Sequence, residues 1–284
     1  MVLAKDLMTM QNPTWCPGCG DFVILMSVRQ AIEKLGWKQE DTVVVSGIGC
    51  GSKLPRFVKV YGFEGLHGRA LPAATAIKLA NKALNVIVVT GDGDGLGIGG
   101  NHFIHTMRRN LNITHIIEDN RVYGLTKGQY SPTSPDGFKS STSLSGALET
   151  PLSPITTAIA GGATFVARTS MINPSKLTDI LIKAMTHKGY AVIDVLQLCP
   201  SYNKTFDMNW YKERLVDLPE NYDSTNKVSA FEKSIEVTEK VNEGIFYIEE
   251  RPTYEDKVTQ MQKEPLVKQN IENIKMDKFY NKFK

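Results

Sequence analysis

Residues 85–95 have the sequence NVIVVTGDGDG, in which a run of mostly β-branched residues gives way abruptly to alternating glycine and aspartate. Such a run is typical of a buried strand, and the glycines after it are typical of a tight turn. A similar run at residues 42–45, TVVV, leads into Ser46 and Gly47. We therefore predict two buried strands with glycine-rich turns at their carboxyl ends.

The segments around these strands alternate between helical and strand patterns. Apolar residues spaced three and four apart predict a helix over residues 22–35, and similar arguments apply further along the chain. The other predicted helices span residues 71–83, 101–110, 154–160 and 174–187, and the other predicted strands span residues 114–118, 164–167 and 191–196. This alternation predicts an α/β fold with a mostly parallel sheet and helices on both faces.

Two segments break the alternation. Residues 128–150 are rich in Ser, Thr, Pro and Gly without apolar periodicity, so we predict a long loop that covers the site. From about residue 205 the chain becomes more charged and aromatic. We predict a main domain over residues 1–204 and a C-terminal extension over residues 205–284 that packs on the domain or on a partner.

Composition narrows the class of protein. The 284 residues are 42% hydrophobic with a net charge of +3, and no apolar run is long enough to span a bilayer. The first twelve residues lack the basic start and apolar stretch of a signal peptide. We therefore expect a soluble, cytoplasmic protein. The basic residues are scattered rather than clustered, which gives no electrostatic argument for nucleic-acid binding.

Asp92 lies in the turn after residues 85–90, and the strand at residues 114–118 leads to Asn120. One strand–helix–strand unit separates them, so both side chains are expected at the same edge of a parallel sheet. Mg²⁺ prefers one or two protein oxygens together with phosphate oxygens and water. The glycine amides and the helix start after Gly100 favour a bound anion. We therefore predict a site for Mg²⁺ and a diphosphate, with Asp94 orienting its neighbours.

The alternative is a plain strand-to-helix turn in which aspartate caps the helix. A Walker A site is excluded because no GK[ST] follows the glycines. The glycines directly after the strand, Gly91, Gly93 and Gly95, also lack the GxGxxG spacing of the dinucleotide fingerprint.

The four cysteines of the chain fall near the same predicted edge. Cys16 and Cys19 form a CxxC loop before the first helix, Cys50 follows the first strand, and Cys199 follows the last predicted strand. In a reducing compartment this pattern favours metal or redox chemistry over disulfides. Four thiolates suit either zinc or a 4Fe-4S cluster.

Residues 12–203 resemble the beta subunit of 2-oxoacid:ferredoxin oxidoreductases. The shared segments are WCPGCG, IGC, LHGRALP, GDGD and DNxxYGLTKGQ, and GDG followed at this interval by Asn is the thiamine diphosphate motif. The resemblance implies the diphosphate-binding type of the thiamine diphosphate fold. It implies that a 4Fe-4S cluster is held by Cys16, Cys19, Cys50 and Cys199, and Mg²⁺ by Asp92, Asn120 and the carbonyl of Val122. Implied cofactor contacts are Ile48, Gly49, Cys50, Gly51, Gly65, Leu66, His67, Gly68, Gly93, Asp94, Gly124 and Leu125.

The resemblance also implies a reaction, the oxidative decarboxylation of a 2-oxoacid such as pyruvate or 2-oxoglutarate. Coenzyme A accepts the acyl group, CO₂ is released, and electrons pass through the cluster to ferredoxin. In enzymes of this type a glutamate on a separate domain activates the cofactor, so the resemblance implies a heterodimer with an alpha, or fused gamma-alpha, subunit. Lys127 and Lys53 are our candidates for binding the substrate carboxylate.

Two other hypotheses stay open. The first is a non-redox thiamine diphosphate-dependent decarboxylase subunit with structural zinc, and the second is a non-enzymatic subunit that carries electrons or scaffolds a partner. The chain also departs from the family pattern, because Gly51 stands where IGCS is often found and Ala76 replaces a glycine. Neither departure removes a ligand, and Ser52 is expected to take over hydrogen bonding near Cys50.

Overall fold

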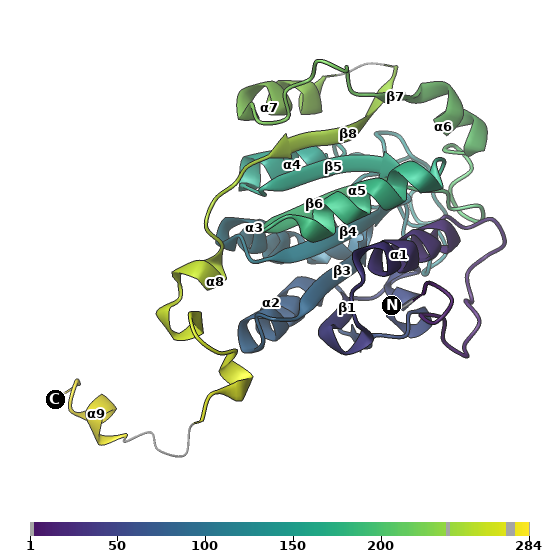
Figure 1. The fold of residues 1–284 in the computed structure, drawn as a ribbon. Helices are drawn as coiled ribbons and strands as arrows, with labels where there is room; N and C mark the ends of the chain where they lie inside the picture. Colours follow the sequence, from purple (N-terminus) through teal and green to yellow (C-terminus); the bar gives the residue numbers. More distant parts are fainter. Residues whose placement is uncertain (1–2, 237–238, 271–275, 284) are drawn as a thin grey trace.

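The computed structural model describes residues 3–236, 239–270 and 276–283 (Figure 1). Its centre is a single eight-stranded sheet with the order β2-β1-β3-β4-β6-β5-β8-β7. The strands are β1 (Thr42–Ser46), β2 (Tyr61–Glu64), β3 (Asn85–Gly91), β4 (Ile113–Asp119), β5 (Phe165–Ser170), β6 (Tyr190–Leu196), β7 (Leu215–Asp217) and β8 (Val241–Ile248). All pairings are parallel except that of β5 with β8.

Helices cover both faces of the sheet, which confirms the predicted α/β class. They are α1 (Asp21–Leu35), α2 (Ala70–Ala80), α3 (Gly100–Arg109), α4 (Pro154–Gly161), α5 (Pro174–Thr186), α6 (Met208–Arg214), α7 (Lys227–Ile235), α8 (Tyr254–Lys257) and α9 (Asp277–Tyr280). One core contains buried residues of α1 and α5 together with strand residues such as Ile87 and Ile116. The other core packs α2, α3, α4 and α7 against alternate residues of the same strands, such as Val88 and Ile117.

The predicted elements of the first 200 residues are confirmed to within a few residues at each end. The central strands β1, β4 and β6 are buried along their whole length, because helices cover them on two sides. Residues 120–153 contain no helix or regular strand, in agreement with the predicted long loop. The short strand β2 was not predicted, and all four of its residues are exposed.

The C-terminal segment contributes two strands to the sheet. β8 pairs antiparallel with β5, and β7 adds beside it at the sheet edge. Beyond β8 the chain descends through α8 at the left of the view, and α9 lies away from the sheet (Figure 1). The division into domains at residue 204 remains a prediction. None of the described helices has the length and apolar character needed to cross a bilayer.

Candidate functional site

A cavity of about 250 Å³ opens at the carboxyl ends of β1, β3 and β4. This is where ligands bind in open parallel sheets. Its lining brings together most of the predicted cofactor and Mg²⁺ residues. They are Ile48, Gly49, Cys50, Gly51, His67, Asp92, Gly93, Asp94, Asn120, Val122, Gly124 and Leu125, joined by Gly91, Glu118, Tyr123 and Thr126.

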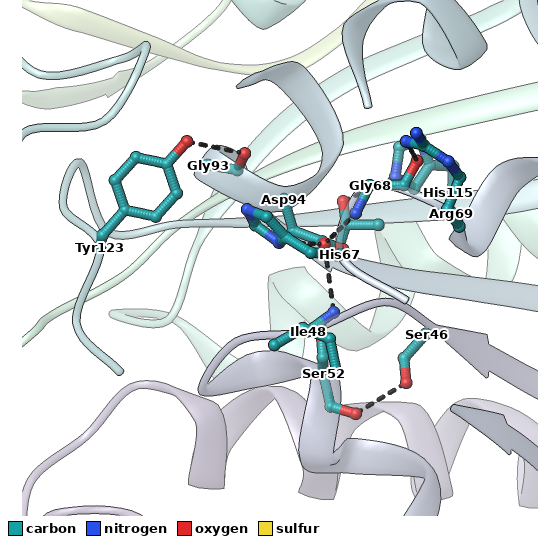
Figure 2. A network of polar contacts seen from close by, with 11 residues as sticks. Ser46, Ile48, Ser52, His67, Gly68, Arg69, Gly93, Asp94, His115 and Tyr123 are labelled. Carbon is teal, nitrogen blue, oxygen red and sulfur yellow. Dashed lines mark hydrogen bonds and ion pairs between the residues drawn. The ribbon is translucent and has the colours of Figure 1, made fainter. Parts of the chain in front are cut away.

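Asp94 holds three loops of this cavity together (Figure 2). Its Oδ1 accepts hydrogen bonds from the amides of Ile48 (3.1 Å) and Gly68 (2.6 Å) and lies 2.8 Å from His67 Nδ1. Its Oδ2 is buried without a hydrogen-bond partner among the described residues. Burial raises the pKa of Asp94, while the Gly68 and Ile48 amides lower it. Asp94 thus orients its neighbours, as the sequence predicts.

Asp92 and Asn120 line the same cavity from the turns after β3 and β4. These strands are adjacent and parallel, which is the arrangement predicted from their spacing. Asp92 is 2% exposed, and burial raises its pKa to about 6. A buried carboxylate is favourable beside a cation, because the opposite charge offsets its desolvation. With the nearby carbonyl of Val122, these oxygens fit the ligand chemistry of Mg²⁺.

The backbone after Asp92 forms a π-helical turn, Gly93–Ile98, followed directly by α3. Such turns are rare and often lie at functional sites. Tyr123 packs on the turn, and its hydroxyl donates to the Gly93 carbonyl at 3.1 Å. A Cβ at Gly93 would lie only 2.2 Å from the Tyr123 ring. Glycine is therefore required here for the close approach of the two loops, and backbone amides at the start of such a turn suit a diphosphate.

The cysteines gather beside this cavity. Sulfur atoms of Cys50 and Cys199 both flank Gly124, since a Cβ at Gly124 would lie 3.7 and 3.5 Å from them. Cys16 is exposed, and its sulfur accepts a hydrogen bond from Ser201 Oγ at 3.1 Å. In the described parts of the chain, no three Cys, His, Asp or Glu side chains form a group suited to a single metal ion.

Burial and neighbouring amides shift the pKa values of the thiols. Burial raises the pKa of Cys50 to about 11 and raises the pKa values of Cys19 and Cys199. The amides of residues 201–203 act in the opposite direction on Cys199, because they donate toward its sulfur. Such donors stabilise a thiolate, the form that binds iron or zinc. The loop at 201–203 therefore supplies hydrogen bonds toward the Cys199 sulfur.

Behind the cysteines lies a buried acidic pair that the sequence did not indicate. Asp21, Glu118 and Gln197 are each no more than 1% exposed, and none of their side-chain oxygens has a hydrogen-bond partner in the described residues. Burial raises the pKa values of Asp21 and Glu118, and the neighbouring Asp21 carboxyl raises that of Glu118 further. Glu118 reaches the cavity wall beside Gly51, where a Cβ would lie 1.3 Å from Glu118 Oε2.

The remaining predicted site residues lie outside the cavity lining. Gly68 acts through Asp94, the Gly65 amide donates to the Ser46 carbonyl, and Leu66 is 76% exposed. Lys127 is exposed with a left-handed φ of 78°, and it lines a separate hollow of about 380 Å³ with Lys139, Ser201 and others. Lys53 is partly buried, and its charge lowers the pKa values of Asp21 and Cys50. Neither lysine lines the cavity, so their binding of the substrate carboxylate remains a prediction.

Two hydroxyl residues of the long loop were missed. Ser131 and Thr133 both bond Asp92 Oδ2, at 2.5 and 2.6 Å. The only signal in the sequence is the segment SPTS at residues 131–134, which resembles any polar turn.

Comparison with known families matches two models to the chain. The thiamine pyrophosphate enzyme C-terminal TPP-binding domain matches residues 47–195. The C-terminal region of the pyruvate ferredoxin oxidoreductase beta subunit matches residues 199–263.

Individual relatives agree. The 2-oxoglutarate oxidoreductase subunit KorB of Mycobacterium tuberculosis is 48% identical over 70% of this chain and 53% of its own length, so the match spans about half of that relative. The 2-oxoacid:ferredoxin oxidoreductase 1 subunit beta of Aeropyrum pernix is 45% identical over 87% of this chain and 81% of its own. A solved structure, 2-oxoglutarate:ferredoxin oxidoreductase from Magnetococcus marinus with 2-oxoglutarate, coenzyme A and succinyl-CoA bound, has a TM-score of 0.93 and 35% identity. It covers 100% of this chain and 96% of that one.

Proposed function

The chain belongs to the family of 2-oxoacid:ferredoxin oxidoreductase beta subunits, and from that premise we propose that it carries thiamine diphosphate, Mg²⁺ and one 4Fe-4S cluster in such an enzyme. The reaction converts a 2-oxoacid and coenzyme A into acyl-coenzyme A, CO₂ and a proton, while two electrons pass to ferredoxin. Pyruvate and 2-oxoglutarate are the substrates that we propose.

One observation carries this proposal, the wall shared by the cavity and the cysteines. Cys50 and Gly124 line the cavity, and a Cβ at Gly124 would lie 3.7 Å from the Cys50 sulfur and 3.5 Å from the Cys199 sulfur. A cluster held by these sulfurs would lie directly against a cofactor in the cavity. Electrons released at the cofactor would then have a short path out, which a redox enzyme needs and a simple decarboxylase does not.

The proposed role of the chain is to bind and orient. Asp92, Asn120 and the carbonyl of Val122 would hold Mg²⁺, and the amides of the Gly93–Ile98 turn would bind the diphosphate. Asp94 would keep the loops at Ile48 and Gly68 at a fixed spacing. When bound, thiamine diphosphate supplies the nucleophilic carbon and the electron sink that decarboxylation requires.

Two further parts of the proposal concern partners. An alpha subunit, or a fused gamma-alpha subunit, would supply the glutamate that activates the cofactor. Lys127 would meet the substrate carboxylate only with a change in the 126–129 turn or with the partner in place, because it lines a separate hollow. Lys53, beside Ser52 and the cysteine loop, remains the second candidate.

The test is to copurify the complex without oxygen and to measure its iron, sulfide, zinc and thiamine diphosphate. The complex is then assayed for ferredoxin reduction with pyruvate and with 2-oxoglutarate, in the presence and absence of coenzyme A. We expect four irons and four sulfides per chain, and ferredoxin reduction that depends on coenzyme A. Colourless protein with bound zinc that releases CO₂ without reducing ferredoxin would support the non-redox decarboxylase instead.

A further inference from the structure

The side-chain hydrogen bonds to the Asp92 carboxylate fall on one of its two oxygens. Among the described residues, both of its side-chain hydrogen bonds fall on Oδ2, from the hydroxyls of Ser131 (2.5 Å) and Thr133 (2.6 Å). No side chain in that set donates to Oδ1. Asp92 also lines the cofactor cavity, so Oδ1 is the oxygen left for a cation.

The two hydroxyls are held in place by their own loop. The Ser131 amide donates to Ser134 Oγ, and Ser134 Oγ donates to the Arg121 carbonyl, both at 2.7 Å. The carbonyl of Pro132 accepts from the Leu152 amide at 2.8 Å. Ser131 and Thr133 are 3% and 7% exposed, so water competes little for them. These bonds fix the hydroxyls before any ligand arrives.

Thr133 Oγ1 also lies between carboxylates of the two proposed metal-binding turns. Its Oγ1 lies 2.6 Å from Asp92 Oδ2 and 2.8 Å from Asp119 Oδ1. Asp119 is the neighbour of Asn120, the second proposed metal ligand. The hydroxyl has one proton, so it donates to one of these carboxylates at a time.

We propose that Ser131 and Thr133 are positioning residues that restrict Asp92 to one-oxygen coordination through Oδ1, and so favour Mg²⁺ over Ca²⁺ at the diphosphate site. Mg²⁺ requires a compact octahedron, in which each carboxylate gives one oxygen. Ca²⁺ is larger, takes six to eight ligands, and often binds both oxygens of a carboxylate. With Oδ2 engaged by two hydroxyls, the second mode is not open to Asp92. This inference rests on the proposed Mg²⁺-diphosphate site.

The experiment measures thiamine diphosphate binding to the complete complex after removal of cofactor and divalent ions. Calorimetric titrations with Mg²⁺ or Ca²⁺ present give the affinity for each ion, without any dependence on turnover. The variants are Thr133→Val, which keeps the shape of the side chain but removes the hydroxyl, and Ser131→Ala. Thr133→Ser restores the hydroxyl. Ser134→Ala is the matched control, because it loosens the same loop and leaves both Asp92 donors present.

We expect Thr133→Val to weaken Mg²⁺-supported binding by about tenfold, the usual effect of losing a hydrogen bond to a charged group. Ca²⁺-supported binding should fall less or improve, so the Mg²⁺/Ca²⁺ ratio should fall by about tenfold. Ser131→Ala should shift the ratio in the same direction, and Thr133→Ser should restore it. Ser134→Ala should lower both affinities by the same factor.

An unchanged Mg²⁺/Ca²⁺ ratio in both Thr133→Val and Ser131→Ala would overturn the inference. The same holds if Ser134→Ala shifts the ratio as much as they do, since the effect would then be a general one of loop packing. If Thr133→Val does not assemble, Ser131→Ala and Thr133→Ser carry the test. Failure of the unaltered complex to bind thiamine diphosphate with either ion would instead refute the proposed function.

Discussion

Buried polar groups occur at both ends of the parallel strands, and the network around Asn110 at the amino ends is more completely paired than the groups around the cavity at the carboxyl ends. At the amino ends, Asn110 Oδ1 accepts from Thr164 Oγ1 (2.8 Å) and from the Tyr190 amide (2.9 Å), and its amide donates to the Pro252 carbonyl. At the carboxyl ends, by contrast, Asp94 Oδ2 and both oxygens of Glu118 have no partner in the described residues.

Native proteins pair nearly all of their buried polar groups, so unpaired ones need an explanation. We infer that the amino-end network stabilises the fold, whereas the carboxyl-end groups are arranged for ligands that bind there. Mutations in the two regions should therefore separate stability from cofactor binding.

The largest effect is expected for Asp92→Ala at the carboxyl end. Because it removes the single carboxylate among the proposed Mg²⁺ ligands, thiamine diphosphate binding should weaken by at least about a hundredfold. Calorimetric titration in the presence of Mg²⁺ measures this. The melting temperature of the cofactor-free chain should change little, because the variant also loses the desolvation cost of burying this carboxylate. A variant that still binds the cofactor tightly, in a complex that still reduces ferredoxin, would favour the non-enzymatic hypothesis.

Asn110→Ala should lower the stability of the fold and leave cofactor binding unchanged. Three hydrogen bonds are lost in a buried setting, and alanine tolerates the left-handed φ of 53° less well than asparagine. We expect the free energy of unfolding to fall by about 3 kcal/mol, measured by urea denaturation. Cofactor affinity of the folded fraction should be unchanged. A loss of cofactor affinity without a loss of stability would contradict the inference that the amino-end network serves only to stabilise the fold.

His115 connects the two regions, since its Nδ1 lies 2.7 Å from Tyr190 Oη and its Nε2 lies 2.9 Å from Thr90 Oγ1. Burial lowers its pKa to about 3, well below the unfolded value near 6.5. The unfolded chain therefore takes up this proton first as the pH falls. The stability that depends on neutral His115 is complete above pH 6.5 and is lost progressively toward pH 3.

Between pH 6.5 and pH 5 this loss amounts to about 2 kcal/mol. His115→Gln keeps polar groups in the same place but does not titrate, so its unfolding free energy should vary less over this range. Urea denaturation at several pH values tests the prediction. Equal pH dependence in both proteins would show that His115 is not the group responsible.

The smallest effect is expected for Ser201→Ala, which removes the hydroxyl that donates to Cys16 Sγ. A donor to a cluster sulfur stabilises the reduced state, so its loss should lower the reduction potential by about 30 mV. An EPR-monitored redox titration of the complex would measure the shift. Thr225→Ala, which removes an exposed hydroxyl that donates to Asp223 in the loop between β7 and α7, serves as the control and should leave the potential unchanged.

The strand and helix pattern was predictable because each element carries its own periodicity. The convergence of Asp92 and Asn120 was also predictable, since adjacent parallel strands must end at the same edge. β8 was missed because its partner β5 lies far from it in sequence and its burial pattern is irregular. Ser131 and Thr133 were missed for a related reason, because polar residues in a long loop reveal their partners only after the chain has folded.

Because Gly51 and Glu118 are in contact, the residue that position 51 tolerates depends on the side chain at position 118. A side chain at position 51 has no room while Glu118 keeps its present rotamer, because a Cβ there would overlap Oε2. Serine at position 51, the residue often expected after this cysteine, should therefore require Glu118 to move to another rotamer or to be replaced by a shorter residue. We expect a double exchange at 51 and 118 to be less destabilising than the single exchange at 51.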